Sequence, residues 1–139
     1  MNEVLFRIRL AERYLEDADG AHRRGDNRGT VSSSQLSVEN SAKAVVAFFR
    51  IPSWSHDLSP ELRELLESIP LGTRPLAEEL AGIAEELAPE HGRSIYGEPI
   101  RGLTPWDIYS EEDAAATLQK ARRAIECARI VLGGLRAIA

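Results

Sequence analysis

Arg50 and His56 are the two side chains of this sequence whose types best suit acid–base chemistry at a phosphate. A histidine can transfer the proton of a ribose hydroxyl or of a leaving group, and an arginine can stabilise charge on the phosphate. Arg-to-His gaps of this size also arise by chance, and His56 can equally cap or pack the turn beside Trp54. The pair therefore supports metal-independent RNA cleavage as one hypothesis.

Three further side chains suit binding. Lys43 and Arg93 can contact a phosphate, and the ring of Tyr96, three residues after Arg93, can stack on a base. The structural alternative is that Arg93 pairs with a glutamate of the preceding helix while Tyr96 packs against the bundle. Lys43 follows Glu39 by four residues, and the structural alternative there is a solvent-exposed ion pair worth about 0.2–0.5 kcal/mol.

Motifs of the common enzyme classes do not occur in this sequence. It has no Gly-rich phosphate loop, no zincin motif and no nucleophile elbow. Only three histidines are present, of which His56 and His91 are candidates for acid–base work. The glutamates of residues 78–86 predict a solvated helix face, because no Glu-x-x-His pattern accompanies them. We expect a binding module that needs no cofactor and no metal.

The composition predicts one all-α domain over residues 1–139. Leu, Ala, Glu and Arg dominate, which favours helix over sheet. A net charge of −5 counts against a nucleic-acid binder that uses its whole surface. Cys127 is the only cysteine, so it predicts a small packed residue and a cytoplasmic protein. Charges throughout the first 18 residues argue against a signal peptide or a membrane span.

Apolar periodicity predicts an antiparallel up-and-down bundle of four to five helices. The second helix has two packable sides and is expected at the centre. Pro52 ends that helix, and Ser59 is expected to cap the next one, which starts with Pro60. Residues 89–109 carry three prolines and three glycines and are expected to be irregular. The predicted helices span residues 2–24, 28–50, 60–69, 75–88 and 111–135.

Several segments together resemble the HEPN domains of prokaryotes. They are SAKAVV at 41–46, PSWSHDL at 52–58 with the Leu-rich short helix after it, RSIY at 93–96, YSEEDA at 109–114, and the spaced alanines of the last helix. Nearly the whole chain is covered by this similarity. Asn40 stands where the family often has Glu, with Glu39 adjacent.

The resemblance implies a helical bundle that often pairs as a homodimer. Relatives are frequently encoded beside a minimal nucleotidyltransferase, as toxin–antitoxin-like pairs, and nucleotide binding has been proposed for this branch. Other branches are RNases that use Arg-x4-6-His, a spacing that Arg50 and His56 satisfy. That motif usually lies at the start of a later helix, where this chain has the reverse order, His91-Gly92-Arg93.

The leading hypothesis is therefore a dimeric binding module that partners a minimal nucleotidyltransferase and binds a nucleotide through Lys43, His56, Arg93 and Tyr96. The alternatives are a ribonuclease that uses Arg50 and His56 on RNA, and a dimerisation scaffold without a ligand.

Overall fold

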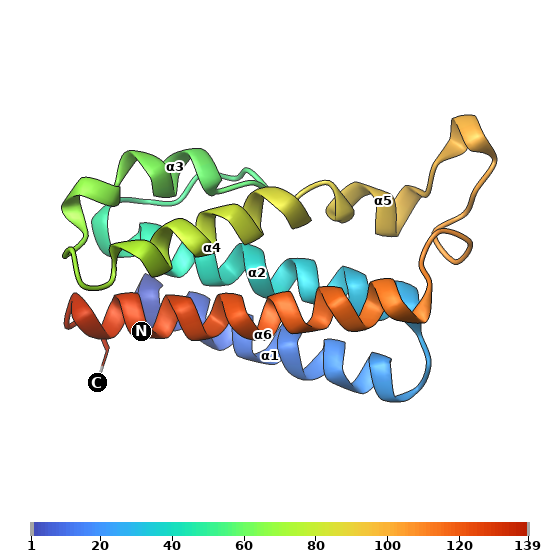
Figure 1. Ribbon diagram of the computed structural model, residues 1–139, viewed down its shortest axis with the longest axis horizontal. Coiled ribbons are helices and arrows are strands. Elements are labelled where there is room, and N and C mark those ends of the chain that lie inside the picture. Colours follow the sequence, from blue (N-terminus) through green and yellow to red (C-terminus); the bar gives the residue numbers. More distant parts are fainter. Residues whose placement is uncertain (1, 139) are drawn as a thin grey trace.

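The computed structural model describes residues 2–138, and within them four long helices run alternately in opposite directions (Figure 1). Two shorter α-helices and two 3-10 turns complete the elements, with no strand in this range and one isolated β-bridge between Glu98 and Leu103. The predicted all-α bundle is confirmed. The elements are α1 (Glu3–Arg23), α2 (Asn27–Phe49), α3 (Ser59–Glu64), η1 (Leu66–Ser68), α4 (Arg74–Leu87), α5 (Glu90–Tyr96), η2 (Pro99–Arg101) and α6 (Glu111–Gly134).

Side-chain caps fix where the helices begin. Asp26 accepts a hydrogen bond from the Gly29 amide at the start of α2. Ser110 and Asp113 form a capping box at the start of α6. The predicted Ser59 cap is wrong: Ser59 is the first residue of α3, and its amide donates to the Asp57 carboxylate at 2.9 Å. Asp57, two residues before the predicted cap, thus accepts a backbone hydrogen bond at the start of α3.

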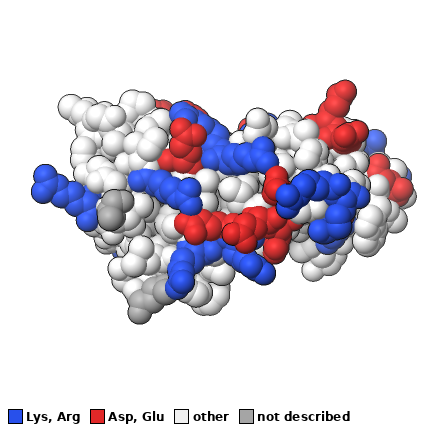
Figure 2. All heavy atoms as spheres, turned by 90° about the horizontal axis from the view of Figure 1, so that it is seen from below, with Lys and Arg blue, Asp and Glu red and all other residues white. Residues whose placement is uncertain are grey.

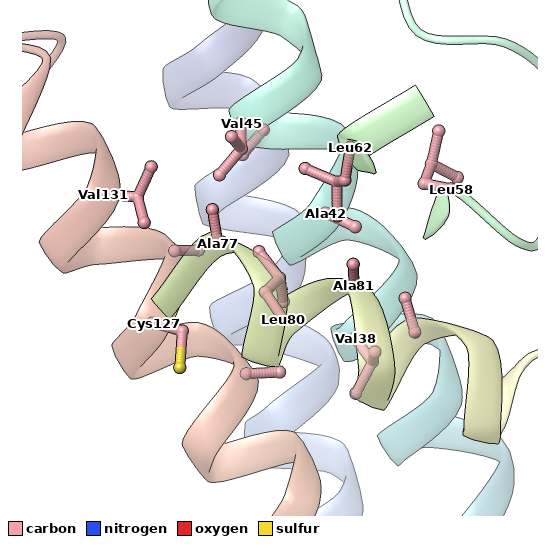
Figure 3. Packing of buried hydrophobic residues seen from close by; sticks show 14 of the residues in the cluster. Val38, Ala42, Val45, Leu58, Leu62, Ala77, Leu80, Ala81, Cys127 and Val131 are labelled. Atoms are coloured by element: carbon pink, nitrogen blue, oxygen red, sulfur yellow. The ribbon is translucent and has the colours of Figure 1, made fainter. Parts of the chain in front are cut away.

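The core lies where α2 meets α4 and α6 (Figure 3). Val38 and Val45 of α2 face Leu80 of α4 and Val131 of α6, and all four are buried. Burial also raises the pKa of Cys127 to about 11, so its thiol stays protonated at neutral pH. The expectations of a central second helix and a packed cysteine are therefore confirmed.

The prediction of an irregular segment over residues 89–109 is wrong for its first part. Pro89 lies just before α5, a position where proline does not interrupt the helix. The helix ends at Gly97, whose φ of +70° favours glycine. A Cβ atom there would lie 2.3 Å from the Leu103 carbonyl oxygen. Residues 97–109, which follow α5, form turns and the short η2 helix and are irregular, as expected.

Acidic and basic side chains are interleaved on the face shown in Figure 2. Arg122 of α6 pairs with Asp19 of α1 at 2.7 Å, and Arg129 pairs with Glu12 at the same distance. A continuous basic field, which a sequence-independent nucleic-acid binder requires, does not form on this face.

Within residues 2–138, no helix combines the length and the apolar character that a membrane crossing needs.

We predict that Leu80→Ala lowers the free energy of unfolding by about 2–5 kcal/mol, because it leaves a cavity between α2, α4 and α6. Leu71→Ala is the matched control, since Leu71 is 76% exposed, and we expect a change below about 0.5 kcal/mol. Urea denaturation followed by circular dichroism measures both values. Equal losses in the two variants would contradict the packing described here.

Candidate functional site

The Glu39 carboxylate on α2 is the centre of a polar cluster inside the bundle. Its Oε2 accepts from Lys43 Nζ at 3.0 Å, and its Oε1 accepts from Gln35 Nε2 at 3.1 Å. His56 Nδ1 lies 2.9 Å from the same Oε1. The Glu39 and Lys43 side chains are each only 7% exposed. Burying this ion pair is therefore offset by hydrogen bonds to both carboxylate oxygens.

A second histidine joins the cluster through Gln35. The Nδ1 atom of His91 lies 3.1 Å from Gln35 Oε1, and a carbonyl oxygen only accepts, so this Nδ1 carries the proton. The same argument places a proton on His56 Nδ1, which faces a carboxylate. The two imidazole rings stack with centroids 3.5 Å apart and planes 15° apart. Both Nε2 atoms are thereby left for a ligand or solvent.

Three separate elements bring these side chains together. Gln35, Glu39 and Lys43 follow one another at four-residue spacing on α2, so they share one face. Pro52 ends the helix and is buried, as is Leu58, and these two residues hold the loop that carries His56. His91 comes from α5, which α2 also fixes through a 2.8 Å bond from Arg28 Nε to the Ser94 carbonyl.

The electrostatics of the cluster favour a charged carboxylate and a neutral His91. Burial raises the pKa of the Glu39 carboxyl, but the bonds from Gln35, Lys43 and His56 outweigh it and leave the pKa below its ordinary value. Burial lowers the pKa of His91, and the neighbouring His56 lowers it further. A positive charge on His91 is therefore disfavoured beside His56 and Lys43.

The interpretation of Glu39 and Lys43 as a solvent-exposed pair is wrong. The face of α2 that carries Glu39 and Lys43 is covered by the loop that contains His56 and by α5. Helical periodicity alone indicates neither contact. Gln35 was missed altogether. Its signal was its position four residues before Glu39, where its amide can reach the carboxylate.

Arg50 and His56 are engaged with different carboxylates. Arg50 Nη2 donates to Glu64 Oε2 at 2.7 Å, in a pair whose two side chains are both largely exposed. His56 is half exposed and faces Glu39 instead. Trp54, the expected packing partner of His56, is 95% exposed. The structure thus gives Arg50 a surface partner of its own, and the pairing of Arg50 with His56 in catalysis stays a prediction.

Arg93 and Tyr96 lie on α5 with His91 but take part in other contacts. Arg93 pairs with Glu90 and with Glu98, at 2.9 Å from the latter, and its guanidinium lies over the ring of Tyr109. These glutamates belong to α5 and the turn after it, whereas the expected partner was a glutamate of the preceding helix. Tyr96 is 75% exposed, so its ring is available for stacking. A ligand role for both residues stays a prediction.

A small cavity of about 130 Å³ adjoins the Glu39 cluster on its Lys43 side. A larger hollow of about 430 Å³ lies between α1 and α6, but two ion pairs cross it, between Arg122 and Asp19 and between Arg129 and Glu12. Of the predicted site residues, Lys43 lines the small cavity, whereas Arg93 lines a separate hollow of about 240 Å³ with Glu90 and Tyr109. The lining residues of the small cavity are Glu3, Arg7, Lys43, Ile51, Pro52, Ser53 and Trp54.

We predict that Glu39→Gln lowers the free energy of unfolding by about 3 kcal/mol, because it leaves the Lys43 ammonium buried without its counter-charge. Adding Lys43→Met to Glu39→Gln removes that charge and should recover most of the loss. The control is Glu85→Gln, which breaks the exposed pair with Arg63 at 2.8 Å and should cost less than about 1 kcal/mol. Urea denaturation of the wild type and the three variants measures these differences. A double variant less stable than Glu39→Gln would contradict the burial of this ion pair.

Comparison with known proteins agrees with this architecture. The crystal structure of TT1696 from Thermus thermophilus superposes with a TM-score of 0.76 at 18% sequence identity, covering 95% of this chain and all of the other. At that identity the likeness concerns the fold alone. No match was found among the curated proteins. The model of the HEPN domain matches residues 4–135, nearly the full length of the chain. The chain belongs to the HEPN domain family.

Proposed function

We propose that this chain is a nucleotide-binding HEPN module that acts as a homodimer with a minimal nucleotidyltransferase. One observation carries the nucleotide part: a cavity lined by two cations opens beside an indole ring that is almost fully exposed. The partner and the dimer are supported by the family alone.

The phosphates are assigned to Lys43 and Arg7. Lys43 lines the cavity while its Nζ stays on Glu39. Arg7 Nε bonds Glu3 at 2.8 Å, and its Nη1 bonds Asn40 Oδ1 at 3.2 Å. The Glu3 side chain is about half exposed, so this pair contributes little and a phosphate can replace the carboxylate. The cavity holds a phosphate group, and the rest of the nucleotide lies outside it.

The base is assigned to Trp54. A tryptophan that is 95% exposed has no packing role in the bundle, and stacking of a base on an aromatic ring is worth about 1–3 kcal/mol. His56 follows Trp54 by two residues, and its Nε2 is left to contact the ribose or a phosphate. Tyr96 with Arg93 is the second predicted stacking pair, on a different element, and is tested in parallel.

We predict that a nucleoside triphosphate quenches the fluorescence of Trp54 and raises the melting temperature, whereas the nucleoside alone does not. Trp106→Phe leaves Trp54 as the single tryptophan reporter. Arg7→Ala should weaken binding about tenfold or more, because a charge-assisted hydrogen bond is lost. Arg13→Ala, on the same helix in an exposed pair with Glu16, should leave affinity unchanged.

The outcomes separate the hypotheses. Loss of binding in Tyr96→Ala but not in Trp54→Ala would move the base to α5 and contradict the assignment to Trp54. No stabilisation by any nucleotide at millimolar concentration would contradict nucleotide binding. RNA cleavage that survives EDTA and disappears in His56→Ala and Arg50→Ala would establish the ribonuclease alternative in its place.

We also predict that the purified chain is a dimer and forms a complex with a minimal nucleotidyltransferase of the same organism. Light scattering after size-exclusion chromatography gives the mass of each species, against 15.4 kDa for one chain. A single complex peak at constant stoichiometry is expected when the two proteins are mixed. Separate elution at concentrations of tens of micromolar would contradict the partnership, and a mass of one chain would contradict the dimer.

A further inference from the structure

We infer that Glu39, His56 and His91 form a binding site for a divalent cation of the zinc class. This site goes beyond the nucleotide proposal: it shares His56 with the proposed nucleotide site, but none of its three ligands lines the Lys43 cavity. One carboxylate oxygen and one ring nitrogen from each histidine lie within 4.8 Å of one another.

The donor set matches the chemistry of zinc. Two imidazole nitrogens and one carboxylate oxygen, with a position left open, are the ligands of many zinc sites that also hold water or substrate. Magnesium and calcium prefer oxygen ligands and suit this set poorly. The three donors come from α2, from the loop after it and from α5, so one ion would join three elements.

The distances require only a local adjustment. Zinc–ligand bonds of about 2.0–2.1 Å place the ligand atoms of a tetrahedral site about 3.3 Å apart. No pair of donor atoms therefore has to close by more than about 1.5 Å. His56 Nδ1 and Glu39 Oε1 already lie 2.9 Å apart. The two rings must tilt out of their stack, because a shared ion lies in the plane of each ring, and the half-exposed His56 has room to move.

Neighbouring groups hold the ligands in place. Gln35 bonds both Glu39 and His91, an outer contact of the kind that orients metal ligands. The ion would bind His56 at Nδ1, so the neutral ring would carry its proton on Nε2 instead, and protonation of either histidine at low pH would weaken binding. Lys43, 3.0 Å from Glu39 Oε2, opposes the ion by its charge. The structure thus predicts modest affinity, limited by one named residue.

The test is titration of the full chain with Co²⁺ and Zn²⁺. A visible absorption band of tetrahedral Co²⁺ with one ion per chain, reversed by Zn²⁺ and not by Mg²⁺, is the expected result. His56→Gln and His91→Gln should each weaken Co²⁺ binding about tenfold or more. His22→Gln is the matched control, since His22 lies in the last turn of α1 outside the cluster, and it should leave binding unchanged.

Lys43→Met distinguishes this inference from the proposed function. Removing the ammonium should strengthen Co²⁺ binding about tenfold or more while it weakens nucleotide binding. Circular dichroism checks that each variant is folded. Absence of the tetrahedral Co²⁺ band in the wild type would overturn the inference, and so would equal affinity in wild type and His91→Gln. Neither result affects nucleotide binding, which is read by Trp54 fluorescence.

Discussion

A buried carboxylate is stable only when hydrogen-bond donors satisfy it, and the candidate site is organised by the donors that bond Glu39. Its two oxygens are bonded by Lys43, Gln35 and His56, from one helix face and from the loop that follows that helix. His91 is then held by Gln35 and by stacking on His56, which ties α5 to the same face. The Glu39 cluster therefore links three elements through polar contacts, beside the apolar core formed by α2, α4 and α6.

The helices were predictable because their signals are local. Apolar spacing, Pro52 as a terminator and the Ser110 capping box each act within a few residues, and the observed boundaries agree with them to within one or two residues for the four long helices. The Glu39 cluster was only partly predictable. Lys43 and His56 were predicted from their residue types. The helix α5 was not predicted, because Pro89 and Gly92 interrupt its helical pattern in the sequence. Without that helix, nothing in the sequence showed that Glu39 and Lys43 would be covered or that His91 would reach His56. Contacts between residues 56 positions apart have no local signal.

Two kinds of ligand are expected to meet at this cluster, and Lys43 acts on them in opposite ways. Its ammonium favours an anion in the Arg7 and Trp54 cavity and opposes a cation at the two histidines. A single positive charge, held 3.0 Å from the Glu39 carboxylate, thus acts on both proposed sites.

The hydrogen bonds of the two imidazoles define the arrangement around Glu39 most directly, and ¹H–¹⁵N correlation spectra of the histidine side chains measure them. The structure predicts that in the metal-free protein both His56 and His91 carry a proton on Nδ1, facing Glu39 and Gln35, and that the pKa of His91 lies below its ordinary value of 6.5 because of burial and the neighbouring His56. Protons on Nε2 alone in both cluster histidines, or a His91 pKa above 6.5, would contradict the arrangement around Glu39.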